Sequence, residues 1–326
     1  MLIGIDHIII GVHNLDEAAK QFSEKPGLQV SGGGIHPSGG TANRIIVIGD
    51  TYLELIAMRA PDEAQQSMRE RLAKGQGYLN FVLGSDDIQA DAEAMRQRGI
   101  AVIGPNAGEL RAGDGRNRGW SRVDVERPDL TQHYPFLIQH DSTGKERRFR
   151  LAGWQTPPGH PLGAISVRST TIAVADLEEA AQRFSHIYGL EPSATFTGEA
   201  DGWDAMLVSF SLGESGQCFE LAMPVPLAVE DNREVGMEHL PEAGALSKYL
   251  EQFGESLCRM TLVVKSLDEA KHYLDEHGVT YSYVEGQHPV LWIHPDYACG
   301  AAIVLHERTD TLDEPAILQP GSVTST

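Results

Sequence analysis

The chain is poor in basic residues, with 26 lysines and arginines against 46 aspartates and glutamates and a formal net charge of -20. Nucleic-acid binding needs lysines and arginines that neutralise phosphates, so this balance argues against a nucleic-acid partner. It also argues against an anionic membrane surface, although a local basic patch can still hold an anionic ligand. No apolar run approaches the roughly 18 residues that cross a bilayer, so we expect no membrane partner.

Cysteine is also scarce. Cys218, Cys258 and Cys299 are too few and too scattered for a disulfide framework or a thiolate zinc site. The opening MLIGIDHIII lacks the basic segment and long apolar stretch of a secretory leader. We therefore expect a cytoplasmic protein.

Several catalytic motifs are missing as well. There is no G-x-S-x-G elbow of a serine hydrolase and no H-E-x-x-H zinc helix. The glycine-rich stretch SGGGIHPSGG contains no G-x-G-x-x-G between a strand and a helix, which argues against a nucleotide-binding loop.

The strongest positive signal is an internal repeat. Residues 7–28 and 169–190 match at a constant offset of 162 (169 minus 7), and residues 80–99 and 259–278 are weaker copies. The identities between the first two segments include Ile10/Ile172, Val12/Val174, Leu15/Leu177, Glu17/Glu179, Ala18/Ala180, Phe22/Phe184 and Gly27/Gly189. Each copy reads as a strand of alternating apolar residues followed directly by a helix. The expected N-caps are Asn14, Asp87, Asp176 and Ser266, and the expected ends lie near Gly27, Gly99, Gly189 and Gly278.

β-rich runs follow each helix, for example residues 44–48 and 52–57 around the turn-forming pair Gly49 and Asp50. One helix for every three or four strands predicts an α+β fold rather than alternating βα units. We expect an N-terminal domain over residues 1–155, a linker over 156–164, a C-terminal domain over 165–310 and a tail over 311–326.

Two motifs carry a resemblance to a known family. The opening D-H-x-x-x-x-V-x-N-L-D-E-A and the later strand YLELIA resemble the vicinal-oxygen-chelate (VOC) superfamily. The segment HPSGGTANRIIVIGDTYLELIAM is similar to its bacterial glyoxalase-like domain proteins, and the likeness covers roughly residues 1–308. It implies four βαβββ modules paired into two domains of the glyoxalase and extradiol-dioxygenase type. It also implies a cavity in which metal ligands come from the first and last strands of modules.

The resemblance implies a metal site at His7 and Glu54. Alternation puts Ile8 and Ile10 on one strand face and His7 with Ile5 on the other, so His7 is expected to face the cavity. Imidazole and carboxylate suit a divalent zinc, nickel, iron or manganese ion, and spacing does not choose among them. The partner module offers Asn80 and Phe136, where fully ligated relatives offer a second His and a second Glu. A third ligand must come from elsewhere, and His36 is one candidate; a plain loop residue is the alternative.

In the second half, Ser169, Glu220 and Arg259 take the corresponding positions, so no metal is expected there. Arg259 is expected to pair with Glu220, either to stabilise the fold or to grip a substrate carboxylate. The remaining candidate substrate-binding residues are Asn80, Asn43, His36 and Trp120. Residues 107–119 are expected to form a polar, solvated loop, with a flap over an anionic ligand as the alternative.

These observations favour a metal-dependent lyase or isomerase acting on a small oxygenated substrate through an enediolate-type anion, with Glu54 as general base. An extradiol-type ring-cleaving dioxygenase is the first alternative, and it normally needs two histidines and one carboxylate. A metal-free binding or resistance protein is the second. The partner is expected to be a small-molecule substrate, and a homodimer is possible because paired modules in one chain neither require nor forbid it.

Overall fold

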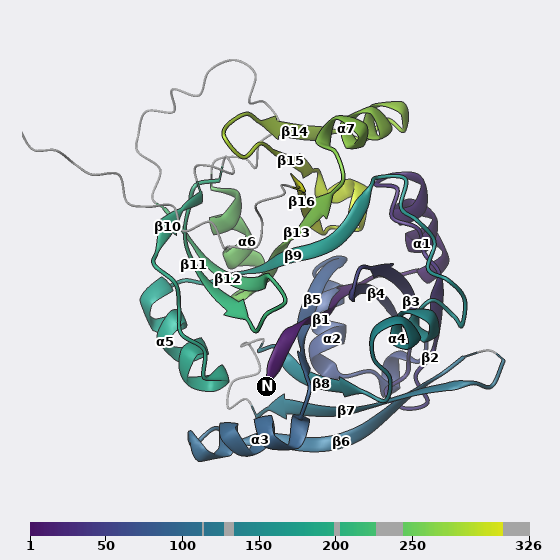
Figure 1. The fold of residues 1–326 in the computed structure, drawn as a ribbon, viewed down its shortest axis with the longest axis vertical. Coiled ribbons are helices and arrows are strands. Elements are labelled where there is room, and N and C mark those ends of the chain that lie inside the picture. The colour runs from purple at the N-terminus through teal and green to yellow at the C-terminus, as the bar shows by residue number, and fades with distance from the viewer. Residues whose placement is uncertain (113, 127–133, 199–202, 226–243, 309–326) are drawn as a thin grey trace, which may run out of the picture.

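The computed structural model describes residues 1–112, 114–126, 134–198, 203–225 and 244–308. The expected tail over 311–326 lies outside the described residues. Two eight-stranded sheets, one from each half of the chain, pack beside each other (Figure 1). No helix among the described residues is long and apolar enough to cross a membrane.

The N-terminal half forms a closed barrel in the order β1-β4-β3-β2-β6-β7-β8-β5. Its first module contains β1 (Leu2–Gly11), α1 (Leu15–Glu24), β2 (Gly32–Ile35), β3 (Thr41–Ile48) and β4 (Thr51–Met58). Its second contains β5 (Gly77–Ser85), α3 (Ile88–Gln97), β6 (Val102–Arg111), β7 (Asn117–Val125) and β8 (Phe136–His140). A 3-10 turn, η1 (Pro61–Glu63), and α2 (Gln66–Ala73) connect the modules, and α4 (Gly144–Leu151) follows them.

The C-terminal half repeats this plan but stays open, in the order β10-β11-β12-β9-β13-β16-β15-β14. One module contains β9 (Ala164–Ala173), α5 (Leu177–Tyr188), β10 (Phe196–Thr197), β11 (Ala205–Leu212) and β12 (Gln217–Pro224). After α6 (Ala245–Phe253), the other contains β13 (Ser256–Val264), α7 (Leu267–Glu276), β14 (Tyr281–Val284), β15 (Val290–Ile293), η3 (Pro295–Ala298) and β16 (Ala302–Glu307). The predicted α+β fold of four βαβββ modules is confirmed.

The helix boundaries follow the local chemistry of the sequence. Side-chain oxygens of the expected N-cap residues accept hydrogen bonds from backbone amides of the first turn at Asn14, Asp87, Asp176 and Ser266. Chain reversal after the helices uses glycines with positive φ at Gly27, Gly99, Gly189 and Gly278.

One apolar core links the two halves. Ile8 and Ile10 of β1 and Phe22 of α1 are fully buried in it. The rings of Phe81 and Phe219, one from each half, lie 5.8 Å apart between centroids. The core therefore fills the space between the sheets and their helices, and the barrel interior is a separate compartment.

A β-bulge interrupts β1. The pairing with β5 runs from Ile5 opposite Leu83 to His7 opposite Val82, so Asp6 is the extra residue. Ile5 accordingly packs in the outer core, whereas His7 points into the barrel. The expectation that Ile5 shares the face of His7 is wrong, because strict alternation fails at a bulge.

Helix α4 covers one end of the barrel (Figure 1). Leu151 and Ala152 pack on the inward-facing Ile45, Val47 and Tyr52. This end of the barrel is thus closed by apolar contact with the helix.

The expected loop over residues 107–119 is also wrong. Strands β6 and β7 pair antiparallel across most of it, from Ala107 opposite Ser121 to Arg111 opposite Asn117. The inward side chains of this ribbon include charged groups, which hide the apolar alternation that normally reveals a strand.

Candidate functional site

His7 lies inside the barrel with 3% of its surface exposed. Its Nδ1 is 2.7 Å from Oδ1 of Asp6, and its ring stacks on Tyr52 at 4.5 Å between centroids. Because a carboxylate oxygen can only accept, Nδ1 carries the proton in this contact. In the neutral imidazole, Nε2 therefore keeps its lone pair.

Glu54, on the neighbouring strand β4, is the acceptor around which the site is built. Its Oε2 is 3.6 Å from Nε2 of His7, and its Oε1 is 3.6 Å from Nε2 of His36. Asn43 donates its amide N–H to Oε1 at 2.6 Å, and Nδ1 of His36 lies 2.9 Å from the Thr41 hydroxyl. The structure thus brings four of the sequence-predicted residues together.

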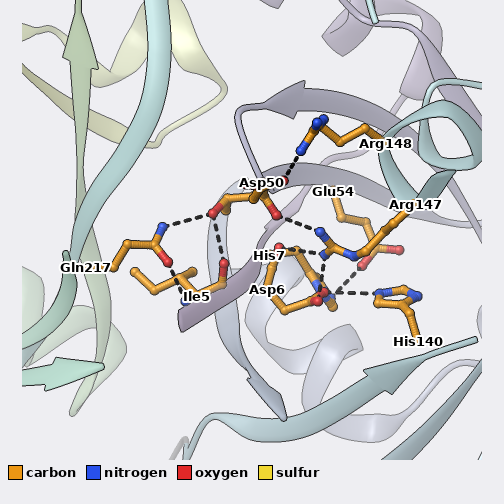
Figure 2. Close-up of polar contacts among 10 residues, drawn as sticks. Ile5, Asp6, His7, Asp50, Glu54, His140, Arg147, Arg148 and Gln217 are labelled. Carbon is orange, nitrogen blue, oxygen red and sulfur yellow. Dashed lines mark hydrogen bonds and ion pairs between the residues drawn. The ribbon is translucent and has the colours of Figure 1, made fainter. Parts of the chain in front are cut away.

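Asp6 forms a buried charged cluster at the other side of His7 (Figure 2). Arg147 of α4 donates to its Oδ2 at 2.6 Å, and Nε2 of His140 lies 3.2 Å from its Oδ1. Helix α4 is therefore tied to the barrel interior by an ion pair as well as by apolar packing.

The charges of this interior shift several pKa values. Burial alone would raise the pKa of Asp6, but Arg147 and His140 outweigh it and hold that pKa well below its ordinary value. Burial likewise opposes ionisation of Glu54, yet His36, His7 and the Asn43 amide lower its pKa. Burial lowers the pKa of His36. Near neutral pH, the interior therefore holds two carboxylates in the charged form beside a neutral His36.

The arrangement of the donor atoms bears on metal binding. Within the described ranges, no group of three or more His, Cys, Asp or Glu side chains is placed so that it could hold an ion. The contacts are pairwise, because His7 and His36 face different oxygens of the Glu54 carboxylate. The chemistry of these donors nevertheless fits a divalent ion, since the acceptor that fixes a ligating imidazole is already in place as Asp6.

Two other predicted residues line the barrel at a distance from Glu54. Trp120 contacts His36 edge-on, at 6.3 Å between ring centroids, and packs against Phe136. Asn80 donates to the Tyr134 carbonyl at 2.8 Å and accepts from the backbone amide of Phe81. The polar atoms of Asn80 thus already have backbone partners.

The predicted pair of the second half is present, in a different sheet. Arg259 donates to Oε2 of Glu220 at 3.0 Å and to the hydroxyl of Thr171, and its guanidinium lies over Trp203 and Trp292. Arg259 is 2% exposed, so a paired cation occupies the interior of this sheet. Neither residue belongs to the site around Glu54.

Sequence reasoning missed Asp6, Arg118, His140 and Arg147. Asp6 stands in the D-H opening that carried the resemblance, and this was the one signal available for it. The other three side chains are brought to the site by strand register and by the packing of α4 on the barrel, and no local sequence pattern predicts either.

An open groove with a volume of about 1020 Å³ lies on the outside of the barrel, lined in part by Arg44, Arg59 and Arg111. His7, His36 and Glu54 are absent from its lining. The groove and the buried site are separate features.

Comparison with known proteins identifies the chain. A family model described as a glyoxalase-like domain matches residues 5–188, more than half of the sequence. The chain belongs to the glyoxalase-like domain family. This finding confirms the predicted VOC relationship. No curated protein matches the chain.

Solved structures resemble the fold of this glyoxalase-like protein. A hypothetical protein from Staphylococcus aureus has a TM-score of 0.63 at 13% identity, covering 93% of this chain and 99% of its own. A mutant of 4-hydroxymandelate synthase from Streptomyces coelicolor has a TM-score of 0.58 at 12% identity, covering 94% and 93%. Methylmalonyl-CoA epimerase from Mycobacterium tuberculosis matches with a TM-score of 0.37 at 21% identity, covering 46% and 92%. At these identities the first two show a shared fold.

Proposed function

We propose that the N-terminal barrel is the active site of a metal-dependent enzyme, a lyase or isomerase of a small oxygenated substrate. His7 and Glu54 would hold a zinc, nickel, iron or manganese ion, and His36, which faces the other oxygen of Glu54, is the candidate for a third ligand. The protein is proposed to act in the cytoplasm. Both modules of the barrel lie in one chain, so a homodimer is not needed to complete the site.

The observation that carries this proposal is the line from Asp6 through His7 to Glu54. Asp6 accepts a hydrogen bond from the Nδ1 proton of His7, so in the neutral imidazole the lone pair of Nε2 is directed toward an ionised carboxylate 3.6 Å away. This separation exceeds that of a hydrogen bond, so the two atoms are not bonded directly to each other. A divalent cation between them would be ligated by both.

The second half of the chain supports the proposed metal site by contrast. There the corresponding carboxylate, Glu220, is neutralised by the guanidinium of Arg259 at 3.0 Å. Glu54 faces two imidazoles, and no ion pair among the described residues joins it to an arginine. At this position, the described part of the first half therefore lacks the direct carboxylate–guanidinium pair that the second half has.

A bound ion would supply a Lewis acid that stabilises negative charge on neighbouring substrate oxygens. Glu54, as general base, would take a proton from the carbon beside a carbonyl and return it to the adjacent position. The Asn43 amide holds one oxygen of this carboxylate, which keeps the other oriented. Trp120 and Phe136 would shield that space from water.

One observation favours a second candidate. Two histidines and one carboxylate are the ligand set of ferrous oxygenases, and His36 supplies the second histidine that sequence alignment of the modules did not. A ring-cleaving dioxygenase is therefore the alternative enzyme. A metal-free binding protein is the alternative outside catalysis.

Metal content tests the proposal. Freshly purified protein is expected to contain stoichiometric metal by mass spectrometry, and His7→Ala, His36→Ala and Glu54→Gln are expected to lose it. His160→Gln is the matched control, because both nitrogens of His160 contact the backbone, at Gln29 and at Val47, and none faces the site.

The proposal would be overturned if folded wild-type protein contains no metal and does not bind any of the four metals when they are added. That result would favour the metal-free binding protein. Oxygen uptake by the iron-loaded protein with a catechol, measured at an oxygen electrode, would favour the dioxygenase. Proton exchange into a hydroxy-ketone without oxygen uptake, followed by NMR in deuterated water, is the result expected for the isomerase.

A further inference from the structure

Arg118 lies inside the barrel. On β7 it shares a strand face with Trp120, whose ring packs against the inward-facing Val82, Phe136 and Ile138. Leu110, opposite Arg118 in the register, is also buried. Arg118 is 5% exposed, so its guanidinium is directed into the same interior as Glu54 and His7.

Nothing in the described part of the chain neutralises this side chain. Its Nη1 is buried without a hydrogen-bond partner, and no hydrogen bond or ion pair to a described residue involves its guanidinium. Burial lowers the pKa of Arg118 although the Glu54 carboxylate raises it, so this carboxylate does not compensate the lost hydration. A buried guanidinium without a counter-charge is costly to the fold.

The guanidinium groups of other buried or nearly buried arginines have hydrogen-bond partners. Arg147 donates to Asp6 at 2.6 Å, Arg259 to Glu220 at 3.0 Å, and Arg71 to the Gly75 carbonyl at 2.8 Å. Arg118 therefore differs from these arginines, because its guanidinium has no hydrogen-bond partner among the described residues.

We infer that Arg118 binds the carboxylate of the substrate, a small organic acid whose carbonyl or hydroxyl oxygen then lies toward His7 and Glu54. The inference rests on the proposed function and deepens it by naming the substrate class. The unsatisfied N–H groups of a guanidinium match the two oxygens of a carboxylate.

Charge and space favour a monocarboxylate over a phosphate. Arg118 is a single cation without a partner among the described residues, and Glu54 shares the interior with it, so a dianion would meet an ionised carboxylate. Helix α4 closes one end of the barrel, which restricts the ligand to a small molecule. Trp120 supplies an apolar wall beside Arg118.

Calorimetric titration of the full-length protein tests the inference, before and after EDTA treatment. The probes are lactate, its neutral analogue lactamide, and inorganic phosphate. Metal-stripped wild-type protein is expected to bind lactate, and Arg118→Gln to weaken that binding by about tenfold to a hundredfold. Arg118→Lys is expected to retain part of the affinity. Arg116→Gln, in the same ribbon and paired with Asp114, is the matched control with unchanged affinity.

Stability gives an independent readout. Ligand-free Arg118→Gln is expected to be at least as stable as wild type in urea, because the substitution removes an uncompensated charge. A clear loss of stability would reveal an internal partner and overturn the inference. Equal affinity of wild type and Arg118→Gln for lactate would also overturn it, as would tighter binding of phosphate or of lactamide.

The two proposals fail separately. If metal content depends on His7 while lactate binding is indifferent to Arg118, the inference is wrong and the metal site stands. If no metal binds while lactate binding requires Arg118, the proposed chemistry is wrong and the anion site stands.

Discussion

Replacing Asp6 with asparagine is the most informative single change in the barrel. The carboxylate is contacted by Nδ1 of His7 at 2.7 Å, Nε2 of His140 at 3.2 Å and a guanidinium nitrogen of Arg147 at 2.6 Å. An amide of nearly the same shape removes the negative charge and leaves Arg147 without its counter-ion. Breaking a buried ion pair from one side costs about 3–5 kcal/mol, so Asp6→Asn is expected to lower the free energy of unfolding by that amount.

Urea unfolding at neutral pH measures this loss. Asp50→Asn is the matched control, since Asp50 pairs with Arg148 of the same helix but its side chain is 80% exposed. An exposed pair contributes about 0–1 kcal/mol, so this variant should unfold nearly like wild type. The double variant Asp6→Asn, Arg147→Met should lose less than the sum of its single changes. Equal losses for Asp6→Asn and Asp50→Asn would refute the reasoning.

The same variant probes the proposed metal site. Asparagine can present its amide N–H to Nδ1 of His7 and so allow the proton to move to Nε2. Loss of such an outer partner typically weakens metal binding by about tenfold to a hundredfold. Competition with a fluorescent chelator measures this change, and unaltered affinity would show that Asp6 does not orient His7.

Three further outcomes are expected. Arg259→Met should lower the free energy of unfolding in urea by about 3–5 kcal/mol, because Glu220 is left buried without its cation, and the loss should shrink when Glu220→Leu is added. Burial lowers the pKa of His306 to about 3, so between about pH 6.5 and 3 the unfolded chain binds the extra proton. Stability should therefore fall with decreasing pH by up to about 1.4 kcal/mol per unit, and His306→Gln should flatten this profile in urea titrations. Gly108→Ala would place Cβ 2.2 Å from Nε1 of Trp120, so a loss of about 1–3 kcal/mol in urea unfolding is expected.

Much of the architecture could be predicted because it depends on residues that are close together in the sequence. The repeat, the caps such as Asn14 and Asp176, and the terminal glycines each depend on residues close in sequence. The inward direction of His7 followed from alternation over a few residues together with the family resemblance. The pairing of Arg259 with Glu220 followed from the need of each buried charge for a partner.

The errors arose where tertiary structure overrules the local pattern. Ile5 lies on the opposite side from His7 because the bulge at Asp6 shifts the pleat by one residue. The strand containing Arg118 looked like a solvated loop, since an interior that carries charge inverts the usual apolar signal. The contact of Arg147 with Asp6 depends on a helix folding back over residues far from it in sequence, and nothing near either residue announces it.

Gln217, the first residue of β12, reaches across the junction to the bulge in β1. Its Oε1 accepts from the amide of Ile5 at 2.8 Å (Figure 2). Its Nε2 donates to the hydroxyl of Thr51 at 2.9 Å. A barrel expressed without its companion half would lose this amide and expose the apolar surface that Phe219 covers. The half without a predicted metal site thus stabilises the barrel of the other half, and random substitutions that weaken activity should be found in both.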